Sequence, residues 1–413
     1  RAPGPTLLAT GAMMTTRRSL WIFATAALAV TAAGCDTRML SPRVVPAVDG
    51  GVPTGTGGTA GGIDASADGP RFVASRKVDI LFVIDDSVEM RLSQDNLIRN
   101  VPGLLTQLMA APVFADLHIA VISTDMGAGD GTIASCDATG GKNGVFQFAP
   151  TGTCSVTGLN PGATYIADDG RTRNYTGNIA DVFGCIANLG EFGCGFERQF
   201  AAMLRALGAD GQPAPPENQG FLRDDAFLLV VMLTNEDDCS AVTEALYDTQ
   251  TNMTLASLLG PPANFRCNEF GHLCNGVRPP RLAPSGNAND MVTLPGCVSA
   301  EGTGYLIPVA DIIGALRTVK PFPDRQIVVA AISGPPTPYT VTWHEPFIPD
   351  TGPWPQIAHS CAAADGASAD PAVRIAQWVG SYGDNGSLLS ICDTSYSSLF
   401  DRIAALLSLT PVN

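Results

Sequence analysis

Three groups of acidic side chains in this chain each come directly after an apolar run. The groups are Asp85–Asp86 after residues 78–84, Asp125 after 117–124, and residues 235–238 after 226–233. Carboxylate and amide oxygens are the ligands that hard cations such as Mg²⁺ and Ca²⁺ prefer. If the three runs are parallel strands, their carboxyl ends share one edge of a sheet, which is where open α/β sheets bind ligands. The pattern therefore predicts a cation site at that edge.

The elements that must position these groups are predicted by hydrophobic periodicity. Residues 78–84 are rich in β-branched side chains, which favours a strand buried on both faces, and residues 90–108 have apolar positions at helical spacing. Further strands are expected at 117–125, 226–233, 326–332 and 387–391, further helices at 178–189, 196–207, 305–319, 372–379 and 396–407, and an edge hairpin between 144–148 and 164–167. Alternation of this kind predicts an α/β fold, with a mostly parallel central sheet and helices on both faces.

The composition of the chain argues against two classes of binding partner. The 413 residues include Lys+Arg 24 and Asp+Glu 39, a net charge of −15, and 45% are hydrophobic. A chain this acidic is a poor ligand for nucleic acid and for an anionic membrane surface. The hydrophobic content is that of a globular protein rather than a disordered one.

The amino end resembles a bacterial lipoprotein signal. A basic segment containing Arg17 and Arg18 precedes a short apolar run at 20–30 and then the small residues 31–34 before Cys35. We expect residues 1–35 to be upstream residues plus this signal, with Cys35 as the lipidated residue. An ordinary signal peptide is the alternative, because Ala32 stands where such signals usually have leucine. Residues 36–73 are rich in Gly, Pro and Thr, which predicts a disordered tether.

Ten cysteines remain after Cys35, an even number in a chain that carries an export signal. Disulfides are therefore expected. Cys267 with Cys274 and Cys185 with Cys194 are the local pairs that spacing suggests, although spacing does not determine connectivity. A zinc site is not expected, since the chain has no C-x-x-C pair and no histidine cluster.

The first acidic group carries a family resemblance. Asp85-x-Ser87-x-Glu89 resembles the D-x-S-x-S signature of the von Willebrand factor A (vWA) domain, whose metal-ion-dependent adhesion site holds one divalent ion. The resemblance extends over about residues 76–408. Within the family, the chain is similar to exported myxobacterial-type lipoproteins with a vWA core. Its other motifs are Gly193-Cys194-Gly195-Phe196-Glu197, Asp237-Asp238-Cys239-Ser240 and Ile391-Cys392-Asp393.

The resemblance implies Asp85 and Ser87 as ligands in the first metal-binding loop. Glu89 replaces a serine there, no threonine occurs near 191–195, and Asn235 replaces the aspartate of the third loop. These departures weaken a Mg²⁺ site, which depends on charge and tight octahedral geometry, whereas Ca²⁺ can use Glu89, Glu236 or Asp237. Two hypotheses stay open: a site for one Mg²⁺, Ca²⁺ or Mn²⁺ ion, and a degenerate scaffold with no ion.

Catalysis is not expected. The chain has no G-x-S-x-G, H-E-x-x-H or G-x-x-x-x-G-K-[ST] motif, its four histidines are scattered, and His118 falls within an apolar run as a packed residue would. We expect one vWA-like domain over 74–413, with insertions near 126–176, 239–303 and 334–368.

The expected function is non-catalytic binding of an unknown protein or envelope component. The protein would be held by its lipid in the cell envelope, on a periplasmic or surface face, and with a metal ion a partner's carboxylate would fill the ion's open position. The alternatives are metal-independent recognition by the loops 126–176 and 239–303, and an extracytoplasmic hydrolase that uses 334–368.

Overall fold

A computed structural model describes residues 76–110, 115–129, 135–136, 140–150, 154–248, 254–260, 264–345 and 352–409. The chain divides into two units, Arg1–Asp68 and Gly69–Asn413, and all described residues belong to the second unit. The predicted signal, Cys35 with its predicted lipid, and the predicted tether at 36–73 lie outside the described residues. No helix in the described part of the chain is long and apolar enough to cross a membrane.

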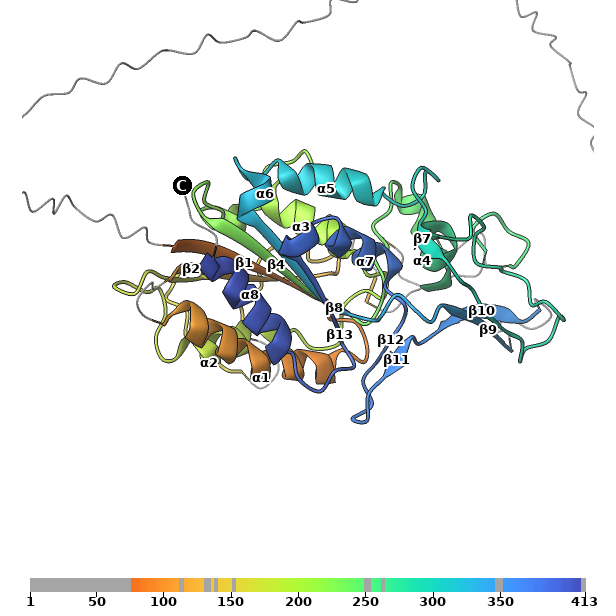
Figure 1. Ribbon diagram of the computed structural model, residues 1–413, viewed down its shortest axis with the longest axis horizontal. Coiled ribbons are helices and arrows are strands. Elements are labelled where there is room, and N and C mark those ends of the chain that lie inside the picture. Colours follow the sequence, from red (N-terminus) through yellow and green to blue (C-terminus); the bar gives the residue numbers. More distant parts are fainter. Residues whose placement is uncertain are drawn as a thin grey trace, which may run out of the picture. The chain divides into compact units, whose positions relative to one another are not determined.

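A six-stranded sheet forms the centre of the second unit (Figure 1). Its spatial order is β3-β2-β1-β4-β8-β13, and every neighbouring pair is parallel except β2 with the edge strand β3. The strands are β1 (Arg76–Ile84), β2 (Ala115–Ser123), β3 (Ile166–Asp168), β4 (Phe227–Leu233), β8 (Ile327–Ser333) and β13 (Gly386–Ser390). The predicted α/β class, with a mostly parallel sheet, is confirmed.

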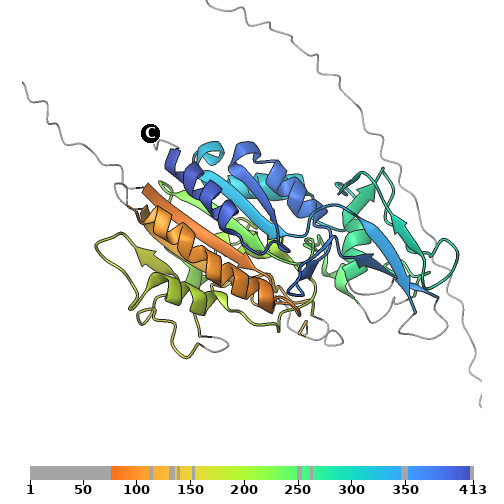
Figure 2. The same ribbon diagram turned by 60° about the horizontal axis from the view of Figure 1, so that its bottom comes forward.

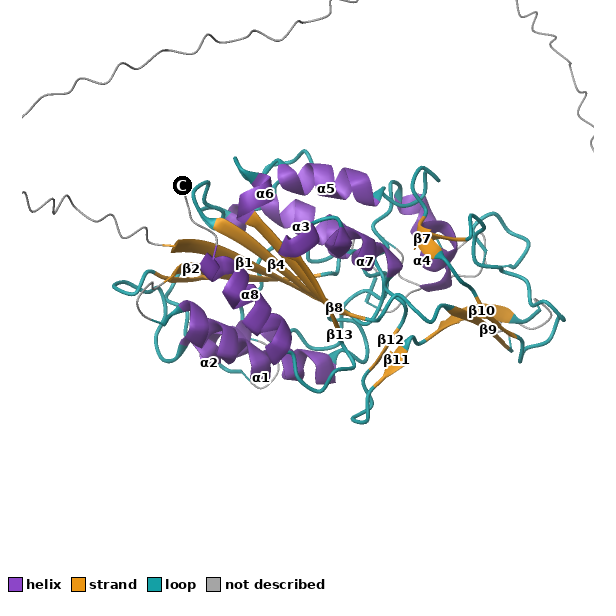
Figure 3. Cartoon of the chain, viewed as in Figure 1, coloured by secondary structure: helices purple, strands orange, loops and turns teal. Residues whose placement is uncertain are grey.

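Helices cover both faces of this sheet, as Figure 3 shows by element type. On one face lie α1 (Arg91–Leu108), α2 (Ile179–Ala187) and α8 (Ser397–Leu409), and on the other lie α3 (Gln199–Leu207), α5 (Val309–Arg317), α6 (Pro323–Gln326) and α7 (Val373–Gly380). Each face has its own apolar core. Ile80 and Phe82 of β1 pack in the first core, while Leu81 and Val83 pack in the second. Burial on both sides explains why the run is continuously apolar rather than alternating.

Only one of the two strands of the predicted edge hairpin is present, so the hairpin prediction is wrong. Strand β3 pairs with β2, and residues 144–148 form no strand. Gly144 has φ of +62°, and a Cβ there would lie 2.8 Å from the Ala202 carbonyl oxygen of α3. The segment is therefore held as a turn against α3, and its link to the sheet is a hydrogen bond from Gln147 N to Val121 O (2.8 Å).

The second and third insertions form an accessory layer beyond the carboxyl ends of the central strands (Figure 2). Its three-stranded antiparallel sheet has the order β10-β9-β6, and two shorter ladders pair β5 with β7 and β11 with β12. The elements of this layer are α4 (Asn264–Gly271), β5 (His272–Cys274), β6 (Met291–Thr293), β7 (Cys297–Ser299), β9 (Thr340–His344), β10 (Trp354–Ala358), β11 (Cys361–Ala362), β12 (Ser368–Ala369) and the 3₁₀ turn Glu244–Tyr247. Two further 3₁₀ turns, Pro216–Asn218 and Gly383–Asn385, precede β4 and β13 of the central sheet. Tyr339, Val341 and Trp343 build a separate small core here with Phe265.

Ten cysteines form five disulfides, which indicates an oxidising, extracytoplasmic compartment. The pairs are Cys136–Cys194, Cys154–Cys185, Cys239–Cys267, Cys274–Cys297 and Cys361–Cys392. The local pairs suggested by spacing, Cys267–Cys274 and Cys185–Cys194, are both wrong. The register of β5 on β7 places Cys274 directly opposite Cys297, so strand pairing rather than proximity in sequence selects the partner.

Candidate functional site

The order of the central sheet reverses between β1 and β4, and open sheets of this kind bind ligands at such a reversal. Ile84 and Leu233 are paired at the ends of the two strands, so the residues that follow them are neighbours. The Thr234 hydroxyl donates a hydrogen bond to Asp85 Oδ2 (2.8 Å). The sequence-predicted meeting of Asp85 with the segment after β4 is therefore observed.

Asp85 is fully buried and both of its carboxylate oxygens are occupied. Oδ1 accepts from the Ser87 backbone N–H (2.8 Å), while Oδ2 accepts from Thr234. Burial raises the pKa of Asp85, and the hydrogen bonds from Ser87 and Thr234 act in the opposite direction. The carboxylate thus fixes the shape of the loop after β1 and ties it to β4.

Asp86 joins three segments at the same edge. Its carboxylate accepts from the Ser123 hydroxyl (2.6 Å) at the end of β2 and forms an ion pair with Lys142 Nζ. Its carbonyl accepts from Gly193 N (2.7 Å). A Cβ on Gly193 would lie 2.3 Å from Asp86 Oδ1, so this close approach requires glycine.

Asp125, the acidic group that follows β2, lies at the same edge of the sheet. Its Oδ1 accepts from Gly127 N (2.8 Å), and burial raises its pKa. The Asp125 carboxylate therefore stabilises the turn that follows β2.

Glu197 is a buried carboxylate immediately before α3, and sequence reasoning named it only as part of a motif. Oε2 accepts from the Thr124 hydroxyl (2.6 Å), whereas Oε1 has no hydrogen-bond partner among the described residues. Burial, followed by the charges of Asp85 and Glu236, raises the pKa of Glu197 well above its usual range. The signal in the sequence was a glutamate between Phe196 and the predicted helix that contains Phe200.

Asp237, predicted as a metal ligand, accepts hydrogen bonds from two other elements. Oδ2 accepts from His272 Nε2 (2.7 Å) and Arg374 N (2.7 Å), and Oδ1 accepts from Ile375 N (3.1 Å). Burial acts to raise the pKa of Asp237, but the hydrogen bonds from His272 and Arg374 outweigh it and the pKa is lowered. The side chain therefore anchors the start of α7 and the strand β5 to the end of β4.

Of the other predicted ligands, Ser87 contacts Asp85 through its backbone N–H, and the Thr234 hydroxyl links Asp85 to Glu236. Glu89 is exposed in the left-handed conformation (φ +78°). Its charge, together with a stronger effect from the hydrogen-bonded Asp370, raises the pKa of His359. Asn235 accepts from Asp370 N (2.8 Å) through its carbonyl, and the Glu236 N–H donates to the Thr234 hydroxyl (3.2 Å).

The divalent ion predicted at this edge stays a prediction. Such an ion needs several free oxygens converging on one point. The carboxylate oxygens of Asp85 and Asp237 accept hydrogen bonds within the protein, and Glu89 is exposed, whereas Asn235 Oδ1 and Glu197 Oε1 are buried with no hydrogen-bond partner among the described residues. In the part of the chain that the structure describes, no group of three or more His, Cys, Asp or Glu side chains is placed to hold a metal.

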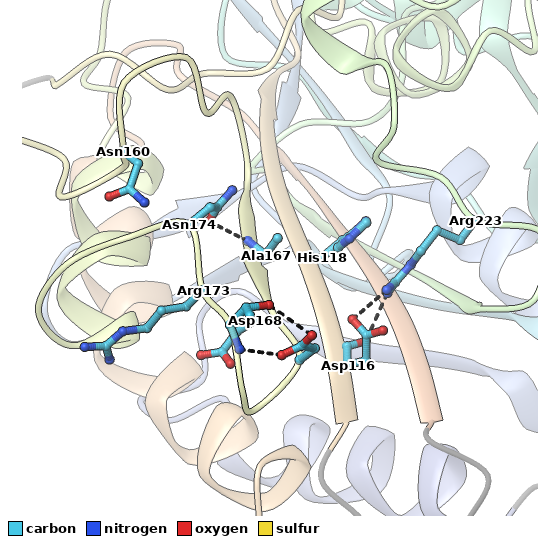
Figure 4. A pocket seen from close by; sticks show the side chains of 10 residues that line it. Asp116, His118, Asn160, Ala167, Asp168, Arg173, Asn174 and Arg223 are labelled. Atoms are coloured by element: carbon cyan, nitrogen blue, oxygen red, sulfur yellow. Dashed lines mark hydrogen bonds and ion pairs between the residues drawn. The ribbon is translucent and has the colours of Figure 1, made fainter.

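A polar cleft of about 470 Å³ lies at the other end of β2, beside β3 (Figure 4). Its walls are largely bonded to one another. Arg223 donates to Asp116 Oδ1 (2.6 Å) and, deeper, to Asp79 Oδ1 (2.8 Å), while Asn174 donates to the Tyr165 carbonyl (2.8 Å). His118, which lines this cleft, lies with Nδ1 2.7 Å from the Phe221 carbonyl, in agreement with the packed role expected for it. These bonds brace the edge strand and occupy the polar groups that line the cleft.

No protein-family model matches this sequence, and no curated protein matches it. Two crystal structures of the pilus adhesin SpaC from Lactobacillus rhamnosus GG are similar to parts of the chain. The open conformation has a TM-score of 0.27 at 14% identity and covers 62% of this chain and 24% of the adhesin. The second has a TM-score of 0.32 at 10% identity and covers 81% and 31%. The chain spans at most about a third of that adhesin, and likenesses of this size carry no argument about function.

Proposed function

We propose that this chain is an extracytoplasmic binding protein with a vWA-like domain, anchored in the cell envelope through a lipid on Cys35. Its binding face is the carboxyl edge of the central sheet at the β1–β4 reversal. The partner is a protein or another envelope component, and binding involves no catalysis.

One observation carries this proposal: disulfide-braced loops converge on the reversal of strand order. Cys194, next to the Gly193 that contacts Asp86, is bonded to Cys136, and Cys239, which follows β4, is bonded to Cys267. The two loops also meet each other, because Cys239 N donates to the Glu197 carbonyl (2.7 Å). Loops held on a rigid sheet are the usual carriers of recognition.

Binding at this face is proposed to be independent of a metal ion. Asp85, the first ligand that the vWA resemblance implies, uses both oxygens within the protein. This leaves metal-independent recognition by the loops as the version of the binding hypothesis that the geometry favours.

A hydrolase is the second candidate, with one observation in its favour. His359 Nδ1 lies 2.8 Å from Asp370 Oδ1, which is the orientation an acid–base histidine needs, and His359 is exposed. A fluorophosphonate probe tests it. We expect no covalent labelling of the full chain, and labelling that is lost in His359→Ala would favour the hydrolase.

Site-specific cross-linking tests the proposed binding face. A photoreactive phenylalanine analogue replaces Phe192, which is 83% exposed beside Gly193, or Phe322, which is 63% exposed at the start of α6 and at the amino end of β8. In native cells we expect a discrete cross-linked product from position 192 and none from position 322, with and without chelator. Products from position 322 alone would contradict the proposal.

A further inference from the structure

Two segments at the reversal are joined side by side by hydrogen bonds. Gln94 Nε2 donates to the Gly190 carbonyl (2.9 Å), and Gly190 N donates to Gln94 Oε1 (3.2 Å). Arg91 N donates to Glu191 Oε1 (3.4 Å), and Gly193 N donates to the Asp86 carbonyl (2.7 Å). Segments 86–94 and 190–193 therefore form one continuous surface.

This surface exposes apolar side chains. Val88 is 71% exposed, Leu92 is 42% exposed and Phe192 is 83% exposed. The Phe192 ring lies over Gly190, whose Cβ position is 3.6 Å from ring Cδ2. We call Val88, Leu92 and Phe192 the apolar patch. Because the three side chains are exposed on one surface built from two joined segments, we take them as a candidate interaction site.

The surroundings of the patch are acidic. Glu89 is exposed between Val88 and the start of α1, Glu191 adjoins Phe192, and Asp95 lies one turn into α1. Two basic side chains lie nearby, and each is paired with an aspartate: Arg91 Nε is 3.7 Å from Asp95 Oδ2, and His359 Nδ1 is 2.8 Å from Asp370 Oδ1. Behind the patch, Asp85 and Glu197 are buried.

The same edge already holds one amine. Lys142 Nζ forms an ion pair with Asp86, whose carbonyl contacts Gly193. Lys142 belongs to a distant segment that lies across the edge, so the edge accommodates an ammonium group brought in by another piece of chain.

We propose that the apolar patch docks a protein segment in which a lysine or arginine lies next to an apolar side chain. The apolar side chain packs on Phe192 and Val88, and the cation pairs with Glu89 and Glu191. This inference rests on the proposed function and names the chemistry of the partner. The partner's side chain is positively charged here, whereas a vWA-type metal site binds a negatively charged carboxylate of its partner.

The physical reason is complementarity at one face. Buried apolar area supplies affinity, while an opposite charge at the rim selects the partner and a like charge repels it. A carboxylate from a partner would approach Glu89 and Glu191, beside basic side chains that are already paired with Asp95 and Asp370.

The test uses the full chain and three fluorescent peptides of equal length, measured by fluorescence polarisation. The first alternates lysine with leucine and tryptophan, the second has glutamate for lysine, and the third has acetyl-lysine. We expect the lysine peptide to bind about tenfold more tightly than either other peptide, with no effect of chelator.

Matched variants locate the binding. Phe192→Ser and Glu89→Lys should each weaken binding of the lysine peptide by about tenfold. Phe322→Ser and Asp384→Lys, at exposed positions elsewhere, should leave it unchanged. An unchanged melting temperature in Phe192→Ser and Glu89→Lys confirms that both fold.

Any one of four results would overturn the inference. The glutamate peptide could bind more tightly than the lysine peptide, or the acetyl-lysine peptide could bind equally well. The lysine peptide could fail to bind, or Phe192→Ser could have no effect on its binding. A partner that cross-links at position 192 while the lysine peptide fails to bind would leave the proposed function standing and remove only the cationic partner. Cross-linking confined to position 322 would remove the proposed function itself.

Discussion

Buried carboxylates at the end of β1 and before α3 determine the chemistry of the candidate site. Asp85 is held by Ser87 and Thr234, so its charge is balanced by hydrogen bonds within the protein. Glu197 has one such bond, from Thr124, and a second oxygen without a partner in the described part of the chain. The two side chains therefore respond differently to substitution.

Glu197→Gln should stabilise the protein at pH 8 by about 1 kcal/mol or more, because it removes a buried charge. The pKa of Glu197 is raised on folding, so the carboxyl group favours the folded state below its unfolded pKa and this contribution is lost as pH rises through the folded pKa. The gain in Glu197→Gln should therefore disappear near pH 4. Denaturant unfolding at both pH values measures the difference in free energy of unfolding between Glu197→Gln and wild type. A difference that is less favourable to the variant at pH 8 than at pH 4 would contradict the raised pKa of Glu197.

Asp85→Ala should lower the free energy of unfolding by about 2 kcal/mol, because it leaves the Ser87 N–H and the Thr234 hydroxyl without their acceptor. Millimolar Mg²⁺, Mn²⁺ or Ca²⁺ should shift the melting temperature of wild type by less than about 1 °C, since a ligand that binds the native state raises it. Differential scanning fluorimetry measures both. A shift of several degrees that Asp85→Ala abolishes would restore the metal site.

At the scale of elements, the reversal between β1 and β4 and the loops beside it make the binding face. Cys136–Cys194 closes a separation of 58 residues and holds the loop that reaches Asp86, whereas Cys274–Cys297 closes 23 residues within the accessory layer. The two disulfides thus support different parts of the molecule.

Replacing both Cys136 and Cys194 by serine should cost about 4 kcal/mol, from the chain entropy of the longer loop, and about 3 kcal/mol is expected for Cys274 with Cys297. Hydrogen exchange should rise at Gly193 only in the first double variant. Equal exchange at Gly193 in both variants would mean that the Cys136–Cys194 disulfide does not brace the binding face.

At the scale of the whole molecule, the five disulfides indicate an oxidising compartment, and the lipid anchor remains a prediction from residues outside the described part of the chain. Cys35→Ser should move the protein from the membrane fraction to the soluble extracytoplasmic fraction, because the lipid is the proposed anchor. Fractionation followed by immunoblotting measures this. An unchanged distribution would favour the ordinary signal peptide.

The sequence by itself determined the central sheet and the place of the site. The runs at 78–84 and 226–233 are apolar because both faces of β1 and β4 are buried, and helical spacing marked α1, so these elements follow from local pattern. Asp85 meets the segment after β4 because the carboxyl ends of parallel strands share one edge.

Only the tertiary structure decided how the side chains are used. Asp237 binds His272 and the start of α7, segments 35 and 137 residues away along the chain. Cys274 pairs with Cys297 because β5 lies on β7. The Glu197 carboxyl group is shielded from solvent because α3 packs on the sheet. Hydrogen-bond partners, disulfide partners and burial depend on contacts between distant segments, and a local pattern of residue types carries no information about those contacts.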